Sequence, residues 1–379
     1  MIYADNAATT RLSKCAFEEM IPYLSDQYGN ASSQYSFGMQ AKRAIERARQ
    51  QVAAAIMAAP SEVVFTSGGS EANSWVLRGI AELYRGESIH IIVSAIEHHS
   101  VLRACKGLEA AGVETSFLPA DCNGRVVVSD LEAAIRPNTR LVSIMLANNE
   151  IGTLQPVAEI GETLRKRRIL FHTDAVQAVG HIPVDVNALR VDFLSASAHK
   201  FNGAKGTGFL YIREGISLLP LISGGKQESG LRGGTENVAG IVAMGCAAEE
   251  SCSAMRARTA HLLALREATI GGLRVQLPGV QIYGDPNYCL PGIISVGFSE
   301  CISGEAMLHQ LDMKGICVSS GSACDSGTDV SSHVLIAIGQ PPARAKAVLR
   351  ISYDHFNSLA DAQTIVNKIV SIHAKIVNR

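Results

Sequence analysis

The sequence predicts an α/β protein with a mainly parallel sheet covered by helices, and a smaller α+β unit toward the C-terminus. Three observations lead to this fold class. Short apolar runs typical of buried strands recur, helical patterns lie between several of them, and the pattern changes from about residue 257. Strands that alternate with helices favour right-handed βαβ crossovers and a sheet buried on both faces.

The individual elements follow in chain order. Apolar residues at steps of three and four predict an amphipathic helix over residues 37–56. Strands are then expected at 63–66, 89–94, 141–147, 169–173, 193–196 and 208–212, and helices at 70–84, 98–111 and 157–168. A long helical stretch at 257–273 precedes further segments at 293–298, 305–315, 347–353 and 358–377. We therefore expect a large domain at residues 13–256 and a small domain made of residues 1–12 and 257–379.

The composition argues against several classes of protein. The 379 residues carry a net charge of −1, so a basic surface for nucleic acid is not expected. The longest apolar run, Val52 to Ala59, is far shorter than the ~18 residues that span a bilayer, so no membrane segment is expected. The nine cysteines form no C-x-x-C pair. This argues against a disulfide framework or a metal site and favours a cytoplasmic protein.

The first chemical signal is a turn of small residues, 66–73, between an expected strand and an expected helix. Glycines let the backbone approach an anion, and the free N–H groups at a helix start favour phosphate. The spacing matches neither the P-loop nor the dinucleotide-binding pattern. An ordinary tight turn without a ligand is the alternative.

Two charged residues follow later strands. Asp174 ends an apolar strand, the place where ligands gather in open α/β sheets, although capping the next helix is an alternative role. Lys200 follows another apolar strand, where a lysine can lose its proton and form a Schiff base, although an exposed lysine is the commoner case. Together, a phosphate-binding turn, a carboxylate and an amine are what pyridoxal phosphate requires.

Short motifs extend this pattern along nearly the whole chain. They occupy residues 3–10 (YADNAATT), 28–33 (YGNASS), 67–71 (SGGSE), 97–98 (EH), 148–152 (NNEIG), 172–174 (HTD), 199–200 (HK), 232–237 (RGGTEN), 319–324 (SSGSAC) and 349–352 (LRIS). In order and spacing the chain resembles the cysteine desulfurases of the NifS/IscS type. These belong to the class-V aminotransferase family and to the fold-type I pyridoxal phosphate enzymes. The resemblance implies a seven-stranded sheet in the large domain and an α+β small domain.

The resemblance also implies roles for residues around the cofactor ring. Lys200 would bind pyridoxal phosphate covalently, Asp174 would pair with the pyridinium nitrogen, and Gln177 would donate to the phenolic oxygen. His98 would stack on the ring and carry protons, and Asn149 would also lie at the cofactor. A carboxylate beside the ring nitrogen keeps the ring protonated, which lets it withdraw electrons from the substrate.

A second set of implied roles concerns the phosphate and the substrate. Small or hydrogen-bonding residues would hold the phosphate: Gly69, Ser70, Ser197 and His199. Thr235 would reach the phosphate of a neighbouring subunit, which implies a homodimer. Asn149 and Arg350 would bind the carboxylate of L-cysteine, a task that suits the planar guanidinium.

Cys324 lies in a stretch of small polar residues, which suits a reactive thiolate better than a buried cysteine. By resemblance it would take sulfur from L-cysteine as a persulfide, release L-alanine, and pass the sulfur to an acceptor protein for iron–sulfur cluster assembly, another thio-cofactor or tRNA thiolation. The alternatives are a selenocysteine lyase or related enzyme, and a silent pyridoxal phosphate-binding scaffold or regulator. Departures from the family pattern at Tyr35, Lys226, Ser295 and Asp354 leave the substrate and the partner open.

Overall fold

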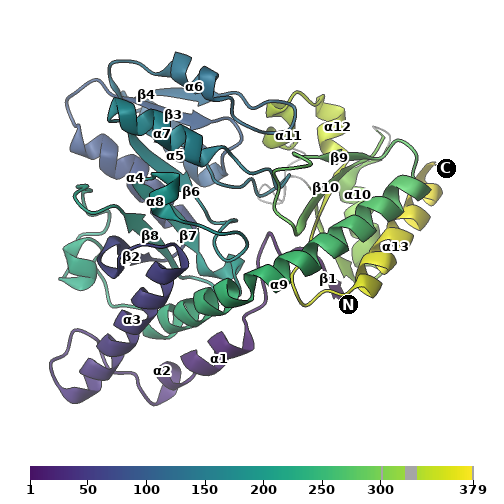
Figure 1. Ribbon diagram of the computed structural model, residues 1–379. Helices are drawn as coiled ribbons and strands as arrows, with labels where there is room; N and C mark the ends of the chain where they lie inside the picture. Colours follow the sequence, from purple (N-terminus) through teal and green to yellow (C-terminus); the bar gives the residue numbers. More distant parts are fainter. Residues whose placement is uncertain (300–301, 321–330, 378–379) are drawn as a thin grey trace.

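A computed structural model describes residues 1–299, 302–320 and 331–377 of the protein (Figure 1). Seven strands form the sheet that we call the large sheet, in the order β2–β8–β7–β6–β5–β3–β4. Strand β8 runs in the opposite direction to the other six strands of this sheet. The strands are β2 (Val63–Thr66), β3 (His90–Ser94), β4 (Glu114–Leu118), β5 (Thr139–Ser143), β6 (Leu170–Asp174), β7 (Phe193–Ser197) and β8 (Gly208–Ile212). The predicted fold class is confirmed.

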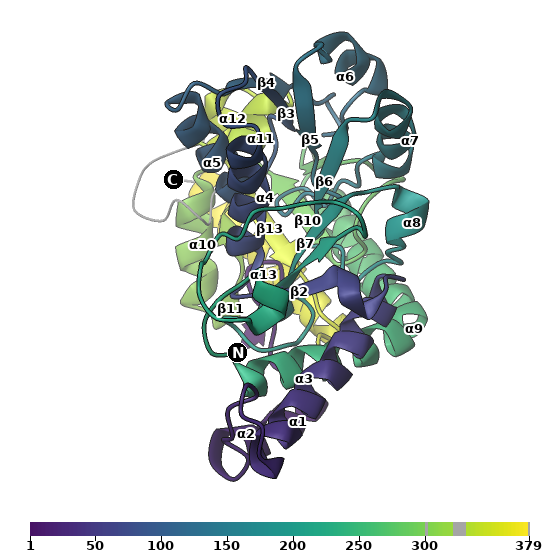
Figure 2. The same cartoon turned by 90° about the vertical axis from the view of Figure 1, so that its left-hand side faces the viewer.

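Helices cover both faces of the large sheet. Figure 2 shows α4 and α5 on one side and α7 and α8 on the other. Along a strand, alternate side chains face opposite layers: Phe193 packs with α4 and α5, whereas Leu194 packs with the layer of α3 and α7. The helices of this region are α1 (Lys14–Met20), α2 (Pro22–Ser25), α3 (Ser36–Ala55), α4 (Gly69–Leu83), α5 (His99–Glu109), α6 (Val128–Ala134), α7 (Val157–Arg167) and α8 (Val186–Leu189).

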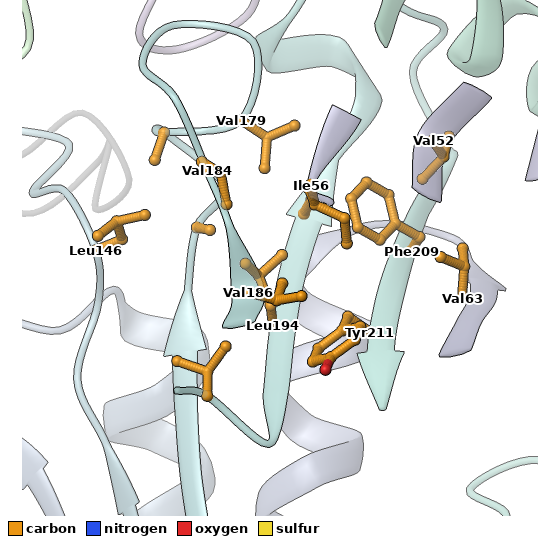
Figure 3. Packing of buried hydrophobic residues seen from close by; sticks show 14 of the residues in the cluster. Val52, Ile56, Val63, Leu146, Val179, Val184, Val186, Leu194, Phe209 and Tyr211 are labelled. Carbon is orange, nitrogen blue, oxygen red and sulfur yellow. The ribbon is translucent and has the colours of Figure 1, made fainter. Parts of the chain in front are cut away.

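The hydrophobic core beneath one face includes side chains of α3 and of strands β2 and β8. Figure 3 shows Val52 and Ile56 close to Phe209 and Tyr211, side chains that the chain almost completely buries. Strand β8 thus contributes to the core although it runs opposite to the other strands of the sheet. Short 3-10 helices connect the layers: η1 (Pro60–Glu62), η2 (Ala198–Lys200) and η3 (Gln227–Gly230).

A four-stranded antiparallel sheet, the small sheet, lies beside the large one in the order β12–β13–β10–β9. Its elements are β9 (Gln281–Tyr283), β10 (Ile293–Gly297), α10 (Gly304–Asp312), β12 (Ser319–Ser320), α11 (His333–Ala337), α12 (Pro342–Lys346), β13 (Val348–Ser352) and α13 (Leu359–Val377). At the N-terminus, β1 (Ile2–Tyr3) pairs in parallel with β11 (Ile316–Cys317). The first residues of the chain therefore lie with its C-terminal part.

The long helix α9 (Val238–Gln276) joins the two parts (Figure 1). It begins well before the predicted stretch at 257–273. Its first turns, residues 239–248, are buried throughout, so they lack the one-sided apolar pattern by which a surface helix is recognised. The expected domain boundary at 256/257 falls inside this helix and remains a prediction, as does the one at 12/13.

The structure differs from the sequence analysis in three points, two about strands and one about cysteines. Strand β4 was not predicted, because only Leu118 of its residues is buried. The strand expected at 141–147 ends at Ser143, and the apolar residues that follow form a buried connection.

Cys15 of α1 and Cys246 of α9 form a disulfide, although the spacing of the cysteines indicated no disulfide framework. Packing of α1 on α9 brings the two together across a sequence separation of 231 residues.

Within the described ranges, no helix combines the length and the apolarity needed to cross a membrane.

A buried histidine connects the three central strands. His172 of β6 lies between the hydroxyl oxygens of Ser143 on β5 and Ser195 on β7, with its ring nitrogens 2.8 Å and 2.9 Å from them. Burial lowers the pKa of His172 to about 3, so the ring is neutral in the folded protein. The three polar side chains satisfy one another inside the sheet.

We predict that His172 contributes to the pH dependence of stability. After unfolding, its pKa returns to ~6.5, so the unfolded chain binds a proton below that pH and the folded chain does not. Stability therefore falls as the pH drops from ~6.5, and urea unfolding at several pH values measures this. His172→Gln should lose ~1–3 kcal/mol at pH 7.5 and show a weaker decline between pH 6.5 and 5. His309→Gln, at an exposed site, is the control; an unchanged decline in His172→Gln contradicts the prediction.

Candidate active site

A cavity of about 520 Å³ opens where strands β6 and β7 end and α4 begins. The carboxyl ends of parallel strands meet at this edge, which is where α/β proteins place ligands. Ten of the predicted site residues line it: Gly69, Ser70, His98, Asn149, Asp174, Gln177, Ser197, His199, Lys200 and Arg350. Cys324 lies outside the described residues. Thr235 is exposed and does not line the cavity.

The predicted phosphate turn forms the start of α4. Gly68 has a φ of +149°, a conformation that favours glycine. At Gly69, a Cβ atom would lie 2.5 Å from the side chain of Val176, so a larger residue would fill the space beside the cavity. The first N–H groups of a helix have no partner within the helix. The turn therefore offers backbone donors to an anion.

An ion pair neutralises the acid in this same turn. Glu71 accepts a hydrogen bond from the backbone N–H of Ser67 and pairs with Arg232, whose Nε lies 3.0 Å from its Oε1. Burial raises the pKa of Glu71, but hydrogen bonds from Arg232 and Ser67 outweigh it, so the pKa lies below its ordinary value. The pair also joins the turn to the segment that carries Thr235.

Asp174 ends β6 and is 5% exposed. One carboxylate oxygen accepts the backbone N–H of Val176 at 2.9 Å and so stabilises the turn after β6. No helix begins at this turn, so the alternative role of Asp174 as a helix cap does not apply. The other accepts the side-chain amide of Asn73 at 2.6 Å. Asn73 was not predicted. Its signal in the sequence is a polar residue on the buried face of α4, one turn beyond Ser70.

Lys200 is held by the N-terminal segment of the chain. Its Nζ donates to the carbonyl oxygens of Ala7 and Ala8 at 2.6 Å and 2.8 Å. The Nε2 of Gln177 also donates to the Ala7 carbonyl, at 2.9 Å. The motif at residues 3–10 does not by itself reveal that these carbonyls accept hydrogen bonds from Lys200 and Gln177. Lys200 is thus oriented inside the cavity and does not extend into solvent.

His98 caps the N-terminus of α5. Its Nδ1 accepts the backbone N–H of Ser100 at 3.1 Å, so the neutral ring carries its hydrogen on Nε2. Burial is the largest cause that lowers the pKa of His98 below its ordinary value; the charge of Lys200 lowers it too, and that of Asp174 opposes them. A neutral imidazole with a defined tautomer is suited to proton transfer.

The buried carboxyl of Glu97 directly precedes His98. Its Oε1 accepts from the hydroxyl of Ser94 and the backbone N–H of Met145. Burial raises the pKa of Glu97 to about 8, with a further increase from the charge of Asp174. The carboxyl is therefore largely protonated at neutral pH, which limits the negative charge beside the cavity.

The two predicted substrate residues lie together. The guanidinium of Arg350, on β13, donates to the Asn149 carbonyl at 2.9 Å and to the carboxylate of Asp5 at 2.8 Å. Arg350 is 3% exposed, and the Asp5 partner was not predicted. The small sheet thus supplies one wall of the cavity.

Comparison with known proteins identifies the family to which the chain belongs. The aminotransferase class-V family matches residues 2–365. The cysteine desulfurase IscS of Methanosarcina thermophila is 45% identical over 377 residues, covering 100% of this chain and 93% of that protein. This chain belongs to the class-V aminotransferase family, among the cysteine desulfurases of the NifS/IscS type. The predicted family is confirmed.

Solved structures give the same result. A NifS-like protein has a TM-score of 0.93 and 38% identity, with 98% of this chain and 99% of that chain covered. A structure described as SspA in complex with cysteine has a TM-score of 0.83 and 36% identity, with coverages of 94% and 100%.

Membership in this family confirms the predicted pyridoxal phosphate cofactor and the class of enzyme. The residues of this chain fit the cofactor, because an amine, a buried carboxylate and a helix N-terminus with a glycine cradle line one cavity.

Proposed function

We propose that this protein converts L-cysteine to L-alanine and passes the sulfur, as a persulfide on Cys324, to an acceptor protein. The observation that carries the proposal is that Lys200, Asp174 and the start of α4 line one cavity in a chain 45% identical to a cysteine desulfurase. The cysteine described in the complex of the similar SspA structure supports L-cysteine as the substrate.

Each side chain around the cavity has a distinct role in this proposal. Bound pyridoxal phosphate supplies an aldehyde and an electron-withdrawing ring. Lys200 would bind the aldehyde, Asp174 the ring nitrogen and Gln177 the phenolic oxygen, since all three line the cavity. Gly69 and Ser70 at the N-terminus of α4, together with Ser197 and His199, would hold the phosphate. The carboxylate of Asp174 is held in place because Asn73 and the Val176 N–H both donate to it.

The substrate is oriented from the side of the small sheet. Arg350 and Asn149 bind the carboxylate of L-cysteine, and the Asp5 carboxylate holds the guanidinium in place beforehand. His98 faces the same cavity and moves a proton with its Nε2. Arg350 and His98 are therefore held in position before the substrate binds.

The sulfur step conserves atoms and electrons. The Cys324 thiolate forms a bond to the substrate sulfur while the carbon–sulfur bond breaks. The electron pair of the broken bond stays with carbon, which gains a proton and becomes the methyl group of alanine. The transfer needs no external oxidant.

The proposal includes a homodimer, a sulfur acceptor and a cytoplasmic location. Thr235 is exposed, and its segment is held from both sides: Arg232 pairs with Glu71, and Glu228 pairs with Arg49 at 2.8 Å. This arrangement leaves Thr235 available to the phosphate of a second subunit. An iron–sulfur scaffold or a sulfur-relay protein is the proposed acceptor.

We predict that Cys324→Ser separates cofactor binding from sulfur transfer. A serine hydroxyl stays protonated where a thiol ionises, so alanine production should fall by at least ~10²-fold while the cofactor spectrum still changes on addition of L-cysteine. Cys122→Ser, at an exposed cysteine, is the control and should retain full activity. Mass spectrometry of the wild-type protein should place the added sulfur on the Cys324 peptide. Sulfur on Cys317, or rapid desulfuration by Cys324→Ser, contradicts the assignment.

We also predict shared active sites. Lys200→Ala and Thr235→Ala subunits should each be impaired alone, but mixing them should restore part of the alanine production. One site of the hybrid then has Lys200 from one subunit and Thr235 from the other. A fully active monomer of about 40 kDa, or a mixture no more active than its components, refutes the shared site.

A further inference from the structure

Asp354 is one of the departures from the family pattern, and the structure places it beside the turn that carries Lys200. It follows β13 and is 4% exposed. One carboxylate oxygen accepts the side-chain amide of Asn202 at 2.7 Å. The other accepts the backbone N–H and the Nδ1 of His355, each at 2.6 Å. A residue next to the small sheet thus contacts the chain two positions after Lys200.

Asn202 adopts a conformation that requires support. Its φ is +65°, a region that residues other than glycine seldom adopt. Its backbone N–H donates to the hydroxyl of Thr10, and its amide donates to the Arg11 carbonyl as well as to Asp354. Arg258 of α9 donates to its side-chain oxygen at 3.3 Å. The turn after Lys200 is therefore held by the N-terminal segment, by α9 and by Asp354.

A second contact acts on Lys200 itself. The Nε2 of His181 lies 2.8 Å from the Lys200 carbonyl oxygen, which fixes the peptide plane from which the side chain projects. Burial lowers the pKa of His181, while its bond to Lys200 and the charge of Asp354 oppose that decrease. Burial raises the pKa of Asp354, but its bonds to His355 and Asn202 and the nearby histidines lower it to about 2. Asp354 is therefore a carboxylate at neutral pH.

The amine of Lys200 is tied to the same part of the chain. Ala7, whose carbonyl accepts from Nζ, donates its own N–H to the hydroxyl of Ser352 at 2.9 Å. Ser352 lies two residues before Asp354. The end of β13 thus holds both the backbone turn after Lys200 and the carbonyl that receives its amine.

We infer that Asp354 is a positioning residue for Lys200: through Asn202 it fixes the turn after the lysine, so that the amine is aimed at the place where the cofactor aldehyde binds. The inference rests on the proposed role of Lys200. It gives a function to a carboxylate that the family pattern does not contain. A merely structural carboxylate would affect the stability of the fold but not the rate at which the folded protein bonds the cofactor.

The test measures the rate of covalent attachment, which does not depend on turnover. Protein freed of cofactor is mixed with pyridoxal phosphate, and the absorbance change of bond formation is followed. Asp354→Asn keeps the shape of the side chain and removes its charge. Asn202→Gly removes the amide while preserving the φ of +65°. Residues in contact commonly couple by about 2- to 150-fold, so each variant should attach the cofactor ~10-fold more slowly.

The double variant decides between positioning and independent effects. Because Asp354 acts on the turn through the Asn202 amide, Asp354→Asn should cause no further loss once that amide is gone. The double variant should therefore be as slow as Asn202→Gly alone, ~10-fold, whereas independent effects would multiply to ~100-fold. Asp361→Asn is the matched control, since that carboxylate bonds the nearby Ser358 N–H at the start of α13. Its attachment rate should equal that of the wild type.

Several outcomes would overturn the inference. These are an unchanged attachment rate in Asn202→Gly, an unchanged rate in a folded Asp354→Asn protein, or a multiplicative double variant. If Asp354→Asn does not fold, Asn202→Gly alone decides. Wild-type protein that forms no bond at Lys200 would instead refute the proposed function, so the two failures are distinguishable.

Discussion

The hydrogen bonds from the Lys200 amine to the Ala7 and Ala8 carbonyls are the interaction on which the site depends. They hold Ala7 and Ala8 at the carboxyl edge of the large sheet, where Asp174 and the start of α4 also meet. The Ala7 carbonyl also receives Gln177. Ala7 and Ala8, which are far from Lys200 in sequence, thus form one wall of the cavity.

The small sheet completes the arrangement. Arg350 on β13 enters the cavity, and Ser352, at the end of that strand, holds the backbone of Ala7. Helix α9 runs continuously between the two sheets and contacts Asn202 through Arg258. A change in the packing of the small sheet would therefore reach both Arg350 and Lys200.

Much of this was predictable from the sequence, for physical reasons. Buried strands such as β2 and β8 were placed correctly because their apolar runs are short and bounded. The family motifs placed ten residues that do line one cavity. What the sequence could not give were contacts between distant segments, such as Asn73 with Asp174, Asp5 with Arg350 and Asp354 with Asn202. Local pattern also failed for β4, which is largely unburied, and for the first half of α9, which is buried all round.

We propose that Lys200, among the amines near the cavity, holds the cofactor. Lys205 also lines the cavity but is exposed, which makes it the natural rival. The decisive measurement is borohydride reduction of the cofactor-loaded protein, followed by proteolysis and mass spectrometry of the peptides. We predict that the cofactor mass is found on Lys200. Its appearance on Lys205, or on no lysine, would contradict the proposed role of Lys200.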